Sequence, residues 1–344
     1  EEQNINGILE CIKNQDYDHN NMEVVLVDGA STDNTRALMC EFALDNKDEF
    51  RRVVVLDNPK KTLPSGWNVA LREYKGDAII KVDAHAVIPE DFVSKNVRVL
   101  ETGEYICGGQ RPNIIDKPTP FKETLLLAES SMFGSSIASY RNNPGKTYVK
   151  SLFHAAYRRE VFEKVGFFNE ELVRTEDNEI HYRMRKAGYK LCFDPDIISY
   201  QYTRSSLKAM LKQKYANGYW IGKTSKVCPK CLSIYHFVPF AFVSAIIASG
   251  SVIGATGLAE CIKKRHNHTL GKGISALRKV TVVLTTVMWV LYALMASGMA
   301  AVSAFKAEDK RNITNACLPV LFLLLHLSYG IGTIAGLMDK SKRG

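Results

Sequence analysis

The chain lacks both glycine-rich loops that commonly cradle nucleotide phosphates, since neither a Walker A motif nor a GxGxxG fingerprint occurs. A nucleotide held by such a loop is therefore not expected. No basic stripe interleaved with aromatic residues is present, so nucleic-acid binding is not predicted despite a formal net charge of +9. Much of the basic excess flanks long apolar runs, a pattern that suits anionic lipid headgroups.

Cysteine spacing gives little support for a zinc site. Only Cys228 and Cys231 of the eight cysteines have ligand-like spacing, and no second pair accompanies them. We therefore expect reduced thiols.

Charged residues are absent from three stretches in the last third of the chain, 236–259, 280–305 and 315–338. Each is long enough to cross a bilayer as a helix, which takes roughly 20 residues. Buried core helices are the alternative. We predict a globular domain over 1–204, an amphipathic interfacial helix region over 205–235 and a membrane domain over 236–344.

Two points in this layout stay open. The region 205–227 mixes lysines with Leu, Met, Tyr and Trp, as an interfacial helix does, but an ordinary surface helix would look similar. A full crossing by the first apolar stretch would place the six cations of 263–279 outside, against the positive-inside tendency. A re-entrant hairpin in that Gly- and Ser-rich stretch would keep them inside, so both topologies remain.

The first part of the chain alternates between short apolar runs and helical patterns. Runs at 23–29, 51–59 and 78–86 predict strands, and each is followed by a predicted helix, the third of which opens on Pro-Glu-Asp-Phe at 89–92. This order is typical of a mostly parallel sheet covered by helices on both faces. The amphipathic opening predicts a helix at the start, and we expect a strand ahead of it that is missing from view.

Two of these strands end in aspartate, Asp28 and Asp83, and His85 follows the second. Ligands of open α/β sheets bind beyond the carboxyl ends of the strands. Asp83 and His85 would lie on one side of a continuing strand, where a carboxylate and an imidazole suit Mg²⁺ or Mn²⁺. Polar turn chemistry is the alternative reading of the same residues.

A second acidic pair, Glu176 and Asp177, opens a predicted helix. Acidic residues in a first turn favour the helix dipole, so an N-terminal structural role is one reading. A general base is the other, and the spacing does not choose between them.

Taken in order, the motifs resemble family 2 glycosyltransferases of the GT-A fold. The similarity covers residues 1 to about 225, and the subgroup that it resembles is the bacterial succinoglycan-type membrane glucosyltransferases. It rests on VDGASTDNT, NPKKTLPSGWNVAL, KVDAHA, RREVFEKVGFFNEEL, TEDNEIHYRMRKAGYK and QKYANGYW. It implies an α/β, doubly wound, mostly parallel sheet that binds a nucleotide-diphosphate sugar, followed by C-terminal transmembrane helices.

The resemblance also implies roles at the ends of the strands. Asp28 would contact the uracil or ribose of the donor, and Asp33 would support that loop. Asp83 would contact the ribose or the metal, and His85 would lie at the metal and the diphosphate.

Further along the chain, Asp177 would be the catalytic base, and Glu176 would help to position the acceptor. Gln213 and Trp220 resemble a Gln-x-x-Arg-Trp element near the diphosphate and acceptor, although the spacing here is wider and no Arg precedes the Trp.

The implied activity is inverting transfer of a hexose from a UDP-sugar, with Mg²⁺ or Mn²⁺, to a lipid-linked glycan at the bacterial plasma membrane, with the catalytic domain in the cytoplasm. Such enzymes serve exopolysaccharide biosynthesis. Synthesis of a glycolipid or polymer, a non-catalytic membrane scaffold and nucleotidyl transfer are the alternatives.

Overall fold

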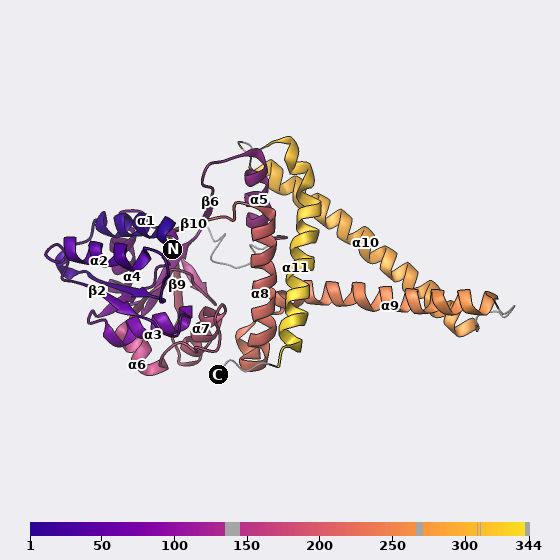
Figure 1. Ribbon diagram of the computed structural model, residues 1–344, viewed down its shortest axis with the longest axis horizontal. Coiled ribbons are helices and arrows are strands. Elements are labelled where there is room, and N and C mark those ends of the chain that lie inside the picture. Colours follow the sequence, from indigo (N-terminus) through magenta and orange to yellow (C-terminus); the bar gives the residue numbers. More distant parts are fainter. Residues whose placement is uncertain (135–144, 266–270, 308, 310, 341–344) are drawn as a thin grey trace.

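The computed structural model describes residues 1–134, 145–265, 271–307, 309 and 311–340. Figure 1 shows an α/β domain at one side, two neighbouring helices α8 and α11 along its flank, and an arm formed by α9 and α10 on the far side of them. The long axis of the molecule therefore runs from the α/β domain through α8 and α11 to the tip of the arm.

The first part of the α/β domain follows the predicted alternation. Strands β1 and β2 pair in parallel, so that Glu23 lies opposite Arg52 and Asp28 opposite Asp57. The elements are α1 (Glu2–Lys13), η1 (His19–Asn21), β1 (Glu23–Asp28), α2 (Thr35–Asp45), β2 (Arg52–Asp57) and α3 (Leu63–Glu73).

A five-stranded sheet forms the centre of the domain, in the order β3-β8-β5-β9-β7. Only β5 and β9 are parallel in it, because β8 runs antiparallel between β3 and β5 and β7 runs antiparallel to β9. The α/β fold is thus confirmed, with sheets that are mixed in direction. The strands are β3 (Ala78–Ile80), β5 (Ile106–Gln110), β7 (Thr147–Val149), β8 (Ala156–Arg158) and β9 (Leu191–Ile198).

A small third sheet, in the order β4-β10-β6, leads from this domain toward the helices. Its strands are β4 (Ala86–Val87), β6 (Asn113–Ile114) and β10 (Tyr200–Tyr202). The remaining helical elements are α4 (Phe92–Glu101), α5 (Pro120–Ser130), α6 (Arg159–Val165), α7 (Glu176–Lys186), α8 (Leu207–Val227), η3 (Pro229–Cys231), η4 (Ile234–Phe237), α9 (Val238–Arg265), α10 (Lys272–Lys306), η6 (Ile313–Cys317) and α11 (Leu318–Met338).

Two predicted boundaries are wrong. The strand expected over 78–86 stops at Ile80 and pairing resumes only at Ala86, so Asp83 and His85 lie in a turn between β3 and β4. Helix α4 begins at Phe92, after the Pro-Glu-Asp sequence expected to form its first turn. All eight cysteines are free thiols, as expected.

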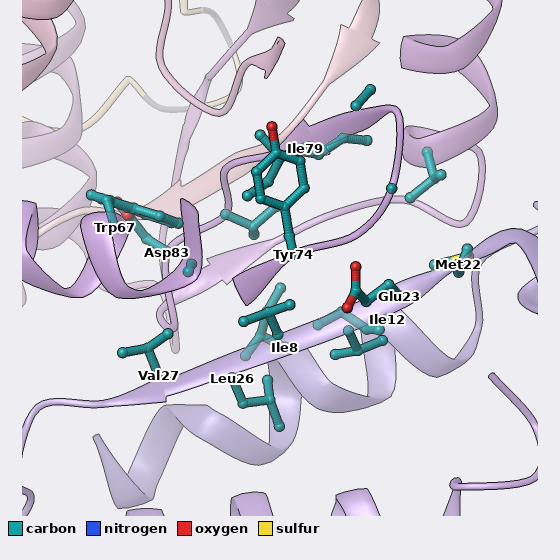
Figure 2. A pocket seen from close by; sticks show the side chains of 18 of the residues that line it. Ile8, Ile12, Met22, Glu23, Leu26, Val27, Trp67, Tyr74, Ile79 and Asp83 are labelled. Atoms are coloured by element: carbon teal, nitrogen blue, oxygen red, sulfur yellow. The ribbon is translucent and has the colours of Figure 1, made fainter. Parts of the chain in front are cut away.

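A cavity of about 1010 Å³ separates β1 from β3. Figure 2 shows it running along β1, with Trp67 and Asp83 at one end and Glu23 and Met22 at the other. Among the described residues, β1 pairs only with β2 and β3 only with β8, so one edge of each strand faces this space. The lining between these ends is largely apolar.

Helices α8 and α11 run side by side and approach closely through glycines. A Cβ atom added at Gly218 would lie 2.0 Å from the Tyr329 carbonyl oxygen, and one at Gly332 would lie 2.1 Å from that of Tyr215. Gly222 and Gly336 make equivalent contacts one turn further on. The two backbones can approach this closely only because side chains are absent at these four positions.

The α9–α10 arm consists of two long helices with few buried residues. By length and composition α9, α10 and α11 could each span a membrane, but 39% of the apolar window of α11 is buried, against 6% and 11% in the other two. Helix α9 is continuous from Val238 to Arg265, so the re-entrant hairpin considered for the first apolar stretch is wrong.

Replacing Gly218 by alanine is expected to separate α8 from α11 and to lower the free energy of unfolding by about 1–3 kcal/mol, the usual cost of overpacking. Gly250→Ala in α9 is the matched control, because its new Cβ meets no atom within 4 Å. Thermal unfolding of the purified full-length protein in detergent measures the difference. Equal midpoints for the two variants would contradict the close packing described here.

Candidate active site

The loop after β1 forms one wall of the candidate site. Asp28 ends the strand and is 2% exposed, and its carboxylate accepts hydrogen bonds from the Ser31 backbone N–H at 3.2 and 3.3 Å. Ala30 lies between them with φ = 57°, a left-handed conformation that non-glycine residues rarely adopt. Such strain is commonly found at functional loops, where surrounding contacts hold it.

Asp33 stabilises the far end of this loop. Its carboxylate accepts hydrogen bonds from the Thr35 hydroxyl at 2.6 Å and from the Thr35 backbone N–H at 3.2 Å. These donors hold the pKa of Asp33 well below its usual range. Asp33 therefore lies where a loop-supporting role is possible.

Asp83, in the turn after β3, pairs with a histidine that the sequence analysis did not identify. Its Oδ2 lies 3.7 Å from Nε2 of His154, and both side chains are largely buried. Burial alone would raise the pKa of Asp83, but His154 and Lys81 outweigh it and hold that pKa well below its usual range. Burial lowers the pKa of His154, so its imidazole is neutral at pH 7.

Within the part of the chain that the structure describes, two buried polar atoms of the Asp83–His154 pair have no hydrogen-bond partner, Oδ1 of Asp83 and Nε2 of His154. A carboxylate oxygen and a neutral imidazole nitrogen in this state are suitable ligands for a divalent cation. Among the described residues, no group of three or more His, Cys, Asp or Glu side chains could hold a metal ion by itself. The pair thus fits a cation whose remaining ligands come from outside the protein.

His85, the other predicted metal ligand, faces β10. Its Nε2 lies 3.1 Å from Nε2 of Gln201, within hydrogen-bond distance. The imidazole also lines the cavity beside Asp83. The structure therefore brings Asp83 closer to His154, while His85 already has a protein partner.

Lys81, the residue after β3, connects the strand ends to the second acidic pair. Its ammonium lies 2.8 and 2.9 Å from the two carboxylate oxygens of Asp177 and 3.9 Å from Oε1 of Glu176. Both acids open α7, as predicted. The Lys81 side chain is only 6% exposed, so one buried cation holds both carboxylates at this end of the domain.

Glu176 is the more buried of the two acids, with a side chain 4% exposed against 18% for Asp177. Burial and the charge of Asp177 raise the pKa of Glu176 to about 8, so Glu176 is largely protonated at pH 7. Burial would lower the pKa of Lys81, but Asp177 and Glu176 outweigh it and raise that pKa above its ordinary value. The buried ammonium is therefore charged, and it pairs with both carboxylate oxygens of Asp177.

Aromatic rings surround this cation. The Lys81 ammonium lies 5.1 Å from the ring centre of Trp67, 5.8 Å from that of Phe153 and 6.0 Å from that of Phe168. Arg111 lies over the other side of Phe153, with its guanidinium carbon 3.9 Å from the ring centre. Rings that exclude water strengthen the electrostatic interactions inside the site.

Helix α8 lies against the start of α7. The Arg174 guanidinium donates a hydrogen bond to the Asn217 side chain at 2.7 Å, and the Thr175 and Thr224 hydroxyls contact each other. Gln213 and Trp220, predicted near the acceptor, belong to this helix; Trp220 is buried, and Oε1 of Gln213 is a buried atom without a hydrogen-bond partner. No described hydrogen bond joins either side chain to Asp83 or to α7.

Sequence reasoning missed three residues of this site: Lys81, Arg111 and His154. A local signal existed for Lys81, because a single lysine directly after three apolar strand residues has to find a counter-charge when it is buried. Arg111 follows β5 and His154 precedes β8, so their approach to the rest of the site depends on strand order, which the local pattern does not specify.

Comparison with known families gives a match for the α/β part of the chain. Residues 1–166 match the family described as Glycosyl transferase family 2. This part of the chain carries a domain of that family. The α/β part is thus a glycosyltransferase domain, as its motifs indicated.

Two curated proteins illustrate the relationship. The succinoglycan biosynthesis protein ExoA of Rhizobium meliloti is 30% identical over 203 residues, which are 58% of this chain and 59% of that protein. The dolichyl N-acetyl-alpha-D-glucosaminyl phosphate 3-beta-D-2,3-diacetamido-2,3-dideoxy-beta-D-glucuronosyltransferase of Methanococcus voltae is 27% identical over 255 residues, 72% of this chain and 77% of that one. The chain thus spans less than two thirds of the first relative and more than two thirds of the second.

A solved structure shares the fold over nearly the whole chain. The mannosyltransferase PcManGT from Pyrobaculum calidifontis, in complex with GDP-Man and Mn²⁺, superposes with a TM-score of 0.57 at 17% identity, covering 99% of this chain and 85% of that chain. At this identity the likeness shows the fold alone, and it supports the predicted GT-A class.

Lys81→Met is expected to leave the carboxylates of Asp177 and Glu176 buried without their cation. Breaking a buried ion pair costs about 3–5 kcal/mol, measured as the free energy of unfolding in urea. Lys60→Met is the matched control, because the Lys60–Glu170 pair has a lysine side chain that is 69% exposed and is worth about 1 kcal/mol or less. Costs within about 1 kcal/mol of each other would show that Lys81 does not bear the buried charge.

Proposed function

We propose that the protein is an inverting glycosyltransferase that transfers a hexose from a UDP-sugar to a hydroxyl of a lipid-linked glycan in cell-surface polysaccharide biosynthesis. The carboxylate of Asp177, which pairs with the buried ammonium of Lys81 through both oxygens, is the observation that carries this proposal. An inverting transfer needs a base near the acceptor hydroxyl, and Asp177 is the less buried of the two acids that open α7.

Asp177 is the base in this proposal. Glu176 is unsuited to the role because its pKa of about 8 leaves it largely protonated at neutral pH. A protonated carboxyl can donate a hydrogen bond, and its buried Oε2 has no hydrogen-bond partner in the protein. We assign Glu176 to positioning the acceptor.

Asp28, Asp33 and Asp83 face the donor in the same proposal. The strained Asp28–Ser31 loop and the Asp33 contacts would hold the nucleoside, since this loop follows the carboxyl end of β1. A Mg²⁺ or Mn²⁺ ion held by Asp83 and His154 would offset charge on the leaving diphosphate. The relative with a bound nucleotide sugar also contains Mn²⁺, which supports this assignment by fold analogy.

The membrane helices fit an acceptor carried by a lipid. The start of α7, which holds Asp177, contacts α8, and α8 packs on α11, a helix apolar enough to enter a membrane. We propose that the domain faces the cytoplasm of a bacterial plasma membrane, where nucleotide-sugars are made. Gln213 and Trp220 on α8 would lie on the acceptor's side of the site.

Asp177→Asn is expected to lower turnover by about 10²–10⁴-fold, the usual contribution of a general base, with donor binding unchanged. Glu176→Gln is the matched variant: it keeps a neutral side chain of the same shape and should cost less than about tenfold. Transfer of radiolabelled sugar to membrane lipids, with donor binding measured separately, distinguishes the two. A larger loss in Glu176→Gln than in Asp177→Asn would reverse the assignment.

Removal of the divalent cation with a chelator is expected to abolish transfer, and Mn²⁺ or Mg²⁺ should restore it. His154→Gln should raise the Mn²⁺ concentration needed for half-maximal activity by about tenfold or more, in the range found when a group that holds a metal is altered. His85→Gln tests the alternative ligand, and a larger shift in that variant would favour the Asp83–His85 site. A panel of UDP- and GDP-sugars in the same assay identifies the donor.

A further inference from the structure

The placement of α11 next to α8 bears on how the chain meets the membrane. Three helices are apolar enough to cross, but they are packed very differently. The α9–α10 arm is exposed along its length, whereas α11 has one side covered by α8. The three helices are similar in composition, but they differ in how much of their surface is buried.

Helix α8 makes polar contacts with two neighbouring parts of the chain. Lys214 pairs with Glu129 of α5 at 3.2 Å, and Glu129 accepts a hydrogen bond from Thr203 at 2.7 Å. Further along, Asn217 and Thr224 contact Arg174 and Thr175, which precede α7. The contacts with Arg174 and Thr175 hold the second half of α8 against the α/β domain.

Helix α11 runs parallel to α8 and stays beside it to its end. The Ser328 hydroxyl donates to the Leu211 carbonyl at 2.7 Å, and beyond the glycine contacts Asp339 lies 3.5 Å from Lys223. The Lys226 ammonium donates to the Asp339 carbonyl at 2.9 Å. Because α8 and α11 run parallel and in contact, the middle of α8 lies at the same membrane depth as the middle of α11.

A bilayer-spanning α11 would carry charge into the hydrocarbon. Lys208, Lys212, Lys223 and Lys226 are distributed along α8, and the α/β domain lies on the side of α8 that faces away from α11. Cations at the centre of a bilayer are costly, and a domain with a polar surface cannot lie at that depth. The packing is therefore incompatible with α11 crossing while α8 stays where it is.

The arm points the other way. Figure 1 shows α9 leaving α11 on the side opposite to the α/β domain and α10 returning from the tip to the start of α11. The uncharged part of α9, 238–259, is about 33 Å long, and that of α10, 280–305, about 39 Å. Either length can cross a hydrocarbon core of about 30 Å. Figure 1 shows α9 nearly perpendicular to α8 and α11 and α10 oblique to them, so α10 would be the more tilted helix in a bilayer.

Charged residues gather at the tip of the arm, where a second layer of headgroups would lie. Lys263, Lys264 and Arg265 end α9, while Lys272 and Arg278 lie near the start of α10. Arg278 also pairs with Glu260, which brings the charged ends of the two helices together. Between this end and α11 the exposed side chains of both helices are predominantly apolar.

We propose that α9 and α10 alone cross the bilayer, as a helical hairpin, and that α11 lies with α8 in the membrane plane at the headgroup level of the leaflet nearest the α/β domain. The partner is the phospholipid bilayer itself. Residues 263–265 and 272–279 then lie at the far leaflet. Cys317 and Lys340, which flank α11, lie on the same side as the α/β domain. This placement does not depend on the sugar transferred.

Labelling of single cysteines in sealed vesicles with a membrane-impermeant maleimide tests the crossings, using the full chain. Cys40, exposed on α2, marks the side of the domain. Cys317 and Lys340→Cys should be labelled from that side, and Cys261 from the opposite one. Labelling of Lys340→Cys from the Cys261 side would show that α11 crosses. Labelling of Cys261 only from the Cys40 side would show that the arm does not cross. Either result overturns the proposal.

Depth measurements give an independent test that does not depend on enzymatic activity. Nitroxide labels at Val320→Cys and Ile331→Cys, on the exposed side of α11, should report equal shallow depths from their accessibility to oxygen and to a nickel chelate. Val283→Cys and Leu294→Cys on α10 are exposed, have the same spacing and should differ in depth. A depth difference in α11 as large as that in α10 would overturn the in-plane placement. Failure here would leave the proposed transfer activity untouched.

Discussion

The contact of α8 with both the glycosyltransferase domain and α11 is the constraint on which the rest of the structure depends. Its polar contacts with Arg174 and Thr175 attach it to the domain, and its glycines bring α11 to backbone contact. A helix held in this way cannot tilt without moving both neighbours. The height of the candidate site above the membrane is therefore set by packing between helices.

Within the domain, burial of Lys81 between two carboxylates creates the chemical asymmetry of the site. Asp177 shares its two oxygens with the ammonium at 2.8 and 2.9 Å, whereas Glu176 approaches to only 3.9 Å and responds to burial by holding its proton. Two adjacent acids in one helical turn thus differ in burial and in their contact with the ammonium. Neighbouring charges and burial, rather than residue type, distinguish a base from a positioning group.

The sequence predicted those elements that depend on local periodicity and capping. The strand over 23–28, the helix beginning at Glu176 and the long apolar helices follow from periodicity and capping, and all three are present. The partner of Asp83 was not predicted, because His154 reaches it through an antiparallel strand inserted into the sheet from about 70 residues away. Likewise, composition cannot distinguish α11 from a free-standing span, since the covering helix α8 lies about 100 residues earlier.

The packing of α8 and the position of the acids at the start of α7 limit how the donor and the acceptor can reach the proposed site. The proposed base lies at the start of α7, which faces α8 and hence the membrane side, while the Asp28 loop follows β1 within the domain. A water-soluble donor can reach the strand ends without entering lipid, but a lipid-linked acceptor has to present its hydroxyl near the headgroups. With α8 and α11 in the membrane plane, Asp177 lies between these two approaches. A spanning α11 would instead turn this face of the domain toward the hydrocarbon, where a charged diphosphate could not follow.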